Sequence, residues 1–479
     1  MTAYLLLIAI TALLVLFTWR IVRRTGQWAF AVGMAVLYVW TFLGAWLFIG
    51  DALSGYQGYR IGFNYYYLMQ KMFPFELDRC YLIALTGYAA FTLLLLLGVW
   101  LMVRRAPKLS FDSDRVLTVD HRVFLLVAGV AAAASYAIIR PVILEAIAVQ
   151  KSIYQYTRHA EYSGATIHAL CNEVVCLGLL MGWAIQLTSG EARYFRGVGQ
   201  RWAAWLYPVA ILVFSFYLMI LGNRHELFMA LILGGAIFLG NAAVLKRRKL
   251  WLYLGVCIVP MFITGKVRNL TWQEMSELDL EGNNKDAPFT LPIIQHVPRH
   301  PKGTVTEFGE KLFSNELFCA HFSLYGICRE HVHPAPFISA RYLAASAVPR
   351  IIREERPPTA YDHYAEQAHL TPGQGYTIHH AAAWYINGGW PGLALGGLLL
   401  GLFWGLLMRL RALPPSKPMA WRVFAILGSS CWVAFLPLLV RDGPEIFKGL
   451  VFEGFAIPMG LVMLAAFAGR KRERNAMAA

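Results

Sequence analysis

The chain has 479 residues, of which 58% are hydrophobic and only 15% charged, and its formal net charge is +15. Soluble globular domains are about 45–50% apolar and about 25% charged, so this composition excludes an ordinary soluble protein and predicts an all-α polytopic membrane protein. A charge this positive also suggests nucleic-acid binding, but the distribution of the charge along the chain argues against that class.

Eleven segments are apolar enough to cross a hydrocarbon core of about 30 Å, which takes roughly 20 helical residues. In chain order they are 3–22, 28–49, 80–103, 122–139, 164–188, 202–221, 225–245, 249–265, 382–408, 420–440 and 448–469. The fourth and the eighth segments are short, and Pro260 interrupts the eighth. We therefore expect about eleven transmembrane helices.

Basic residues cluster in alternate connections between these segments, which predicts the orientation of the chain. The clusters lie at 20–24, 104–105, 193–201, 246–249, 409–411 and 470–474. The positive-inside rule places these connections and the C-terminus in the cytoplasm, and the N-terminus outside. In the external connections acidic and basic residues roughly balance. The net charge is therefore mostly a topology signal, and we expect no nucleic acid among the partners.

The segments divide the chain into three predicted parts. Residues 1–265 hold the first eight spans, 266–381 form one large external loop before the third-last span, and 382–479 hold the last three spans and a cytoplasmic tail. Apolar residues at helical spacing predict an amphipathic helix over 307–331, lying on the membrane, and a second short helix over 338–347.

External loop 51–79 is rich in aromatic residues, Tyr66 among them. Such residues form an interfacial belt or a platform for sugar rings, and the sequence leaves both interpretations open. The chain has neither a G-x-x-x-x-G-K-S/T loop nor a strand-linked G-x-G-x-x-G motif. The energy for any reaction must therefore come from the substrate or from an ion gradient.

His379 and His380 stand at the predicted start of the span near Ala381. We expect them to lie half in water and half in protein, where a histidine can act as a general base near neutral pH. A histidine that only caps the helix is an equal alternative. The other loop histidines have no carboxylate or cysteine cluster at ligand spacing, so we expect no metal site.

Three arginines stand at predicted external ends of spans. Arg224 lies in a tight turn in which Asn223 is expected to cap the next helix, with Glu226 as its capping-box partner. A helix N-terminus disfavours a cation, but its free N–H groups and an arginine together suit a phosphate. Arg441 and Arg140 occupy similar places, so a diphosphate is the expected ligand. Arginines that only snorkel to the interface are the alternative.

Several short elements together resemble those of a known family. They are 347–350 (Ala-Val-Pro-Arg), 356–358 (Arg-Pro-Pro), the turn 222–224 (Gly-Asn-Arg) and 384–392 (Trp-Tyr-Ile-Asn-Gly-Gly-Trp-Pro-Gly). In this order they resemble bacterial O-antigen polymerases, the Wzy-type oligosaccharide repeat-unit polymerases. The helix start at His380 also resembles that of the related O-antigen ligases. Arg356 departs from the lysine that polymerases often have, and the histidine pair also departs from many of them.

The resemblance implies a fold of the glycosyltransferase-C (GT-C) kind in the bacterial inner membrane, serving lipopolysaccharide or exopolysaccharide biosynthesis. It implies a glycosyltransferase that joins two undecaprenyl-diphosphate-linked oligosaccharides, a donor and an acceptor, on the outer face of the membrane. Neither a nucleotide sugar nor a metal or other cofactor is implied. A polysaccharide co-polymerase that regulates chain length is an implied partner besides the lipid bilayer.

The same resemblance lets us assign expected roles to individual residues. The catalytic residues would be His380 or His379, as the base on the attacking hydroxyl, and Arg224, on the leaving diphosphate. Further diphosphate ligands would be Arg441, Arg350 and Arg140. The expected glycan contacts are Tyr376, Tyr385 and Tyr66.

Two other functions stay open. An O-antigen ligase would move the finished glycan to a different acceptor, with the same span count and arginines. A polysaccharide or lipid transporter (flippase) would need no covalent chemistry. Transporters usually show charged residues within their spans and internal repeats. Here Glu173 and Glu453 are the main acids within spans, and we find no repeat.

Overall fold

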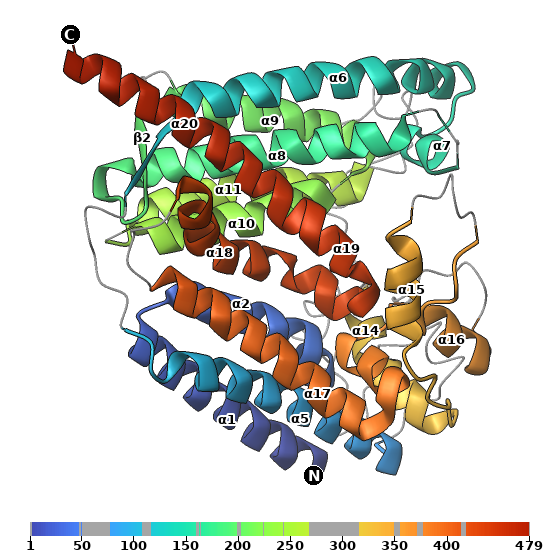
Figure 1. Cartoon of the computed structure of the whole chain (residues 1–479). Coiled ribbons are helices and arrows are strands. Elements are labelled where there is room, and N and C mark those ends of the chain that lie inside the picture. The colour runs from blue at the N-terminus through green and yellow to red at the C-terminus, as the bar shows by residue number, and fades with distance from the viewer. Residues whose placement is uncertain are drawn as a thin grey trace, which may run out of the picture. The chain divides into compact units, whose positions relative to one another are not determined.

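Figure 1 shows the computed structural model of the chain. It describes residues 2–46, 49, 77–107, 116–159, 162, 164–198, 203–223, 225–242, 244–267, 316–348, 355–370, 377–412 and 418–478. Most of the described residues are helical, and nine of the described helices are long and apolar enough to cross a membrane. The protein is an all-α polytopic membrane protein.

The chain forms two compact units. Unit 1 comprises Met1–Ser110, His300–Leu413 and Phe435–Gly454. Its elements are α1 (Thr2–Thr25), α2 (Trp28–Tyr38), the π-helix η1 (Val39–Leu43), α5 (Arg79–Val103), α14 (Glu316–Arg329), α15 (Ile338–Ser346), α16 (Ala360–Gln367), α17 (His380–Arg411), the end of α18 (Met419–Asp442), η5 (Pro444–Ile446), α19 (Phe447–Gly449) and the start of the π-helix η6 (Leu450–Ala456).

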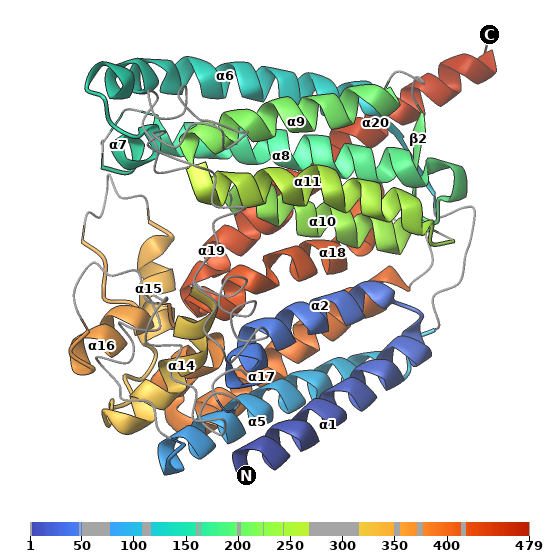
Figure 2. The same ribbon diagram turned by 180° about the vertical axis from the view of Figure 1, so that it is seen from behind.

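Unit 2 comprises Phe111–Arg299, Pro414–Ala434 and Phe455–Ala479. Its elements are β1 (Leu117–Asp120), α6 (His121–Ala148), α7 (Ile153–His159), α8 (Ala165–Thr188), η4 (Ser189–Glu191), β2 (Phe195–Val198), α9 (Ala203–Leu221), α10 (His225–Asn241), α11 (Arg247–Val267), the start of α18 and α20 (Ile457–Ala478). The helices α8, α9, α10 and α11 pack beside one another (Figure 2).

As far as the structure describes them, a helix covers most of each of the eleven segments predicted to span the membrane. Two of these helices, α10 and α11, are not among the described helices that meet the length and apolarity expected of a span. Helix α10 has only 17 residues. One predicted boundary is wrong, because α6 does not stop before Pro141 but continues to Ala148. A proline inside a helix removes one hydrogen bond, and neighbouring helices in a membrane protein can compensate for that loss. Arg140 therefore lies within α6, not at its end.

Glycines allow α5 and α17 to pack in direct backbone contact (Figure 1). Gly397, Gly401 and Gly405 recur every four residues, so they share one face of α17. A Cβ at Gly397 would lie 2.5 Å from the carbonyl oxygen of Phe91, and one at Gly401 would overlap the Leu95 carbonyl. Small residues at this spacing let helices in membranes approach closely. This contact fixes α17 against α5 along most of its length.

Parallel strands β1 and β2 form a two-stranded sheet in unit 2, with Leu117 paired to Phe195. The side chain of Asn241 holds β2 in place, because its Oδ1 accepts from the backbone N–H groups of Tyr194 and Phe195 at 2.9 and 2.8 Å. Its Nδ2 donates to the hydroxyl of Thr188 at 2.6 Å. This buried amide therefore joins α10, α8 and β2 through satisfied hydrogen bonds.

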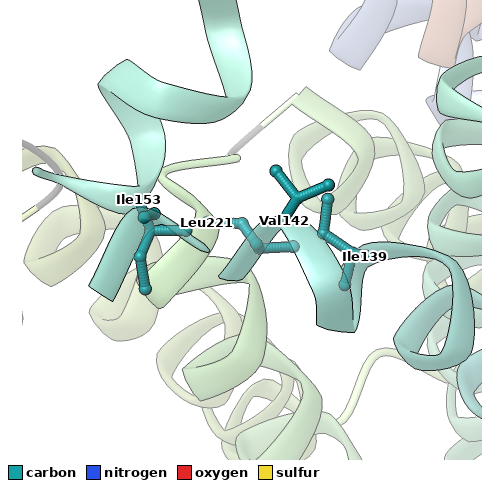
Figure 3. Close-up of a cluster of buried hydrophobic side chains, with 5 residues drawn as sticks. Ile139, Val142, Ile153 and Leu221 are labelled. Carbon is teal, nitrogen blue, oxygen red and sulfur yellow. The ribbon is translucent and has the colours of Figure 1, made fainter. Parts of the chain in front are cut away.

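A hydrophobic cluster anchors the short helix α7 to its neighbours (Figure 3). Ile153 of α7 packs with Ile139 and Val142 of α6 and with Leu221 of α9. Van der Waals packing against these side chains explains why so short a helix is held.

We expect Gly401→Val to destabilise unit 1 by about 1–3 kcal/mol or more, because the new side chain would overlap the backbone of α5. The measurement is thermal unfolding of the purified protein in detergent. Gly460→Val is the matched control, since nothing lies within 4 Å of a Cβ at Gly460. Equal losses in the two variants would show that valine in a helix, and not the helix contact, causes the effect.

Candidate functional site

Helix α17 begins at His380, as the sequence predicts, and His379 is its N-cap. The Nδ1 atom of His379 accepts a hydrogen bond from the backbone N–H of Ala381 at 3.0 Å. The expectation that the histidine pair lies half in water is wrong, because His379 is 0% and His380 1% exposed. Both rings are enclosed within unit 1.

The partners of His379 fix its protonation. Since Nδ1 accepts a hydrogen bond, the neutral ring carries its proton on Nε2 and donates it to the hydroxyl of Thr41 at 3.1 Å. The backbone N–H of His379 donates to the hydroxyl of Ser323 at 3.0 Å. The cap thereby ties α17 to η1 and to α14.

His321 of α14 forms the second half of this network. Its Nδ1 lies 2.7 Å from the backbone carbonyl of Thr41, which can only accept, so Nδ1 carries the proton. Its Nε2 then accepts from the hydroxyl of Tyr81 at 3.0 Å. Tyr88 donates its hydroxyl hydrogen to the carbonyl of His321 at 2.6 Å. We call Thr41, Tyr81, Tyr88, His321 and His379 the histidine network.

Helix α14 differs from its prediction as an amphipathic surface helix. The structure describes it over Glu316–Arg329, and residues 320–327 are buried on every side. The first part of the predicted helix, 307–315, lies outside the described residues. Apolar spacing predicted the helix correctly, but its polar face is buried because His321 and Ser323 find partners on α5, η1 and α17.

Both histidines of the network stay neutral near physiological pH. Burial lowers the pKa of His321 to about 4, and its hydrogen bond to the Thr41 carbonyl opposes only part of that effect. Burial also lowers the pKa of His379, and the neighbouring rings of His380 and His321 lower it further because a second positive charge there would be repelled.

His380 makes its own contacts, separate from the histidine network. Its Nε2 accepts from the indole N–H of Trp384 at 2.9 Å. The backbone of Leu439 and Gly443 lies near the ring. Nδ1 makes no hydrogen bond of normal geometry among the described residues. The lone pair that a general base needs is therefore occupied by Trp384 in this state.

A second polar cluster joins the short helices to α17. The side chain of Asn387 donates to the hydroxyl of Ser339 at 2.6 Å and accepts from the backbone N–H of Ser339 at 3.0 Å. One carboxylate oxygen of Glu445, Oε1, accepts from the Ser339 hydroxyl at 2.7 Å and from the backbone N–H of Ala360 at 2.9 Å. The carboxylate thus lies at the N-termini of α15 and α16, where the helix dipoles favour a negative charge.

Two features hold this cluster at the N-terminal end of α17. The backbone of Gly388 and Gly389 is not helical, and Gly389 has a φ of +61°, so α17 kinks directly after Asn387. Arg356 donates to the backbone carbonyls of Ala345 and Val348 at the end of α15. A cation is stabilising at a helix C-terminus, so Arg356 completes that helix.

Arg441 lies in the last turn of α18, which approaches the first turn of α17. Its guanidinium forms a two-pronged ion pair with the carboxylate of Asp442, at 2.8 and 2.7 Å. Gly443 has a φ of +76°, and a Cβ there would lie 3.1 Å from that of Ala383. The arginine is about a quarter exposed, so its fork can be reached from outside.

The remaining carboxylate oxygen of Glu445 was not anticipated from the sequence. Oε2 is buried and has no hydrogen-bond partner among the described residues. Glu445 lies in η5, directly after the end of α18 that carries Arg441. Buried carboxylate oxygens normally accept a hydrogen bond. This oxygen is therefore available to accept a proton or a hydrogen bond from a substrate hydroxyl. In the sequence, Glu445 is recognisable only as an acidic residue in the short external connection between the last two predicted spans.

The other expected site residues are distributed as follows. Tyr385 of α17 packs its ring against Trp390 with 5.3 Å between centroids. Arg140 is exposed on α6 in unit 2. The expected site residues outside the described part of the chain are Arg224, Arg350, Tyr376 and Tyr66. Within the described ranges, no group of three His, Cys, Asp or Glu residues could hold a metal ion.

Comparison with family models, with curated protein sequences and with solved structures found no match to this chain.

Acid should destabilise the protein through the histidine network. An unfolded histidine has a pKa of about 6.5, whereas His321 in the folded protein has a pKa of about 4. Between these values the unfolded state binds more protons, so the free energy of unfolding falls as the pH falls, by up to about 1.4 kcal/mol per pH unit for each such histidine. Thermal unfolding at pH 7 and pH 5 measures this.

The matched variants separate His321 from all other acid effects. His321→Gln keeps a donor and an acceptor but cannot titrate, so we expect its unfolding temperature to depend less on pH than that of the wild type. His333→Gln, at an exposed position, should behave as the wild type does. The same pH dependence in all three proteins would contradict the role assigned to His321.

Proposed function

We propose that this chain is a membrane glycosyltransferase that polymerises polyprenyl-diphosphate-linked oligosaccharides on the outer face of a bacterial inner membrane. One observation carries the proposal. Two of the elements that resemble the polymerases, 356–358 and 384–392, supply Arg356 and Asn387. Both residues bind α15, so they belong to one connected assembly at the start of α17. Arg441 and Glu445 belong to the same assembly.

The proposed topology has eleven spans, with α10 and α11 completing the set. It places the N-terminus outside, the C-terminus in the cytoplasm, and the segment between α11 and α17 on the external side as a GT-C-like cap. The basic clusters of the connections support this orientation. The short helices α14, α15 and α16 then cover the external end of α17, where lipid-linked substrates would arrive.

The reaction we propose forms one glycosidic bond and breaks another. A hydroxyl of the acceptor glycan attacks the anomeric carbon of the donor, the bond to the diphosphate breaks, and polyprenyl diphosphate leaves with the bonding electrons. Negative charge develops on the leaving group, and arginines stabilise it. We assign Arg441 this role, with Arg224 and Arg350 as further ligands. To bind, a phosphate would share or displace Asp442, whose carboxylate already occupies the guanidinium fork.

The acceptor hydroxyl must lose a proton during this step. His380 can take it only if Trp384 first releases Nε2. One oxygen of Glu445 has no hydrogen-bond partner among the described residues, and Glu445 lies in η5, directly after the end of α18 that carries Arg441. We therefore propose Glu445 as the proton acceptor and His379 and His380 as residues that position α17. Tyr385, Tyr376 and Tyr66 remain the proposed glycan contacts, and a chain-length co-polymerase remains a proposed partner.

A transporter is the second candidate, and one cluster in unit 2 favours it. The hydroxyl of Ser135 donates to Asn172 at 2.6 Å and lies 2.8 Å from the hydroxyl of Tyr217, which is 3.1 Å from His168 Nε2. Polar groups inside membrane spans often mark a substrate path. Because these groups bond to one another, they also hold α6, α8 and α9 together without any transport role.

Deletion of the gene in its host separates the candidates, with the surface polysaccharide analysed on a gel. A polymerase predicts loss of the ladder with a single repeat unit left on its acceptor. A ligase predicts that lipid-linked polymer accumulates, and a transporter predicts that single lipid-linked units accumulate on the cytoplasmic face. An unchanged ladder would contradict the proposed polymerase.

Complementation of that deletion with Arg441→Ala should lower polymer formation by about 10²–10³-fold, the usual cost of removing one donor to a developing negative charge. Arg341→Ala is the control, because Arg341 is exposed and donates to the backbone of the same cap. Both variants must be present at wild-type amounts in the membrane. Wild-type polymer with Arg441→Ala would remove Arg441 from the site.

The Glu445→Gln variant tests the proton acceptor without removing the structural bonds. Glutamine keeps an oxygen for Ser339 and Ala360 but no longer takes a proton. We expect an unchanged unfolding temperature together with a loss of polymer of about 10²–10⁴-fold, the usual contribution of a general base. Normal polymer in Glu445→Gln but not in His380→Gln would return the role to His380.

A further inference from the structure

Two cysteines meet where α14 ends beside the start of α5. Cys328 lies in the last turn of α14, and Cys80 is the second residue of α5. The ion pair between Arg329 and Asp78 brings these two helix ends together, and the two thiols interact with each other there. Both are free thiols and both are partly exposed. The sequence does not predict this pair, because the two cysteines are far apart in the chain and several predicted spans lie between them.

Independent contacts hold the two helix ends in register around the thiols. Asp78 caps α5 by accepting from the backbone N–H of Tyr81 at 2.8 Å. The other oxygen of the same carboxylate pairs with Arg329 at 3.5 Å and lies 3.5 Å from the hydroxyl of Tyr325. Arg329 also donates to the Tyr325 hydroxyl at 2.8 Å. The backbone around the cysteines is therefore fixed before any bond between them forms.

We propose that Cys80 and Cys328 form a disulfide, an inference that rests on the proposed topology, which places both residues on the external side. The step is thiol–disulfide exchange with a disulfide-carrying protein of the external compartment. The Cys80 thiolate attacks that disulfide, and Cys328 then attacks the mixed disulfide. One S–S bond forms in this chain, and the donor leaves as a dithiol that holds the two electrons and the two protons. Disulfides require closely placed thiols, as this pair provides, and an oxidising compartment.

The surroundings favour a stable bond over a labile one. Burial raises the pKa of the Cys328 thiol, and the contact with Cys80 raises it further. A thiol with a raised pKa is a poor leaving group, so cleavage in which Cys328 leaves is slow. The bond would fasten α14 to α5 beside the contact between Tyr81 and His321. It would thereby protect the histidine network, which the noncovalent contacts alone already form.

The test is mass spectrometry of full-length protein in host membranes, alkylated with N-ethylmaleimide before lysis and digested without reductant. We expect a cross-linked peptide pair that contains Cys80 and Cys328 and lacks the two thiol hydrogens. Neither cysteine should be alkylated until the sample is reduced. Recovery of both residues in alkylated form, with no cross-linked pair, would overturn the proposal.

Thermal unfolding provides a second measurement that does not depend on detecting the peptide. A phosphine reductant should lower the unfolding temperature of the wild type and of Cys171→Ser, in which a partly exposed cysteine on α8 is removed. It should leave Cys80→Ser and Cys328→Ser unchanged, at the temperature of the reduced wild type. Equal responses of all four proteins to the reductant would contradict a stabilising disulfide.

Discussion

The direct contact between α5 and α17 is the constraint on which the rest of unit 1 depends. Glycines on α17 let its backbone reach the carbonyl groups of α5, so the two helices cannot slide or rotate without a clash. This fixes the level of Tyr81 and Tyr88 relative to His379. Because these polar groups are then buried, each must find a partner, and α14 and η1 supply them.

The buried cap explains both the character of the histidines and the position of the candidate site. Charged imidazoles would be costly in this enclosed region, and the observed hydrogen bonds require the neutral tautomers of His379 and His321. The reactive groups near the start of α17 must therefore be ones that are exposed or that lack a hydrogen-bond partner among the described residues. Arg441 and the second oxygen of Glu445 meet that description; Arg441 lies in the last turn of α18 and Glu445 in η5, which follows it.

Hydrophobic runs alone predicted the nine described helices that are long and apolar enough to cross a membrane, because the apolar length that a bilayer demands is a local property of the sequence. Boundaries were less predictable. Pro141 suggested an end to α6, yet the helix continues past it because tertiary packing tolerates the missing donor. Helix α16 was not anticipated, although the Thr359 and Asp362 capping box that begins it is readable in the sequence.

The candidate site was predictable only in part. The start of α17 and the residues of the family-like elements were found from local patterns, and Asn387 and Arg356 among them bind the short helices. The pairing of Thr41 with His379 and His321 was not predictable, because it joins residues hundreds of positions apart and no spacing rule records such contacts. For the same reason the exposed position expected of the histidine pair was wrong.

The most direct test of the central claim uses purified protein in liposomes that hold one synthetic undecaprenyl-diphosphate oligosaccharide as donor and acceptor. The measurement is the glycan length together with the undecaprenyl diphosphate released. The proposed polymerase predicts longer lipid-linked glycans and one released lipid diphosphate for each new glycosidic bond, without nucleotide. Release that occurs only when a different acceptor is added, or no release at all by protein that is folded, would contradict it.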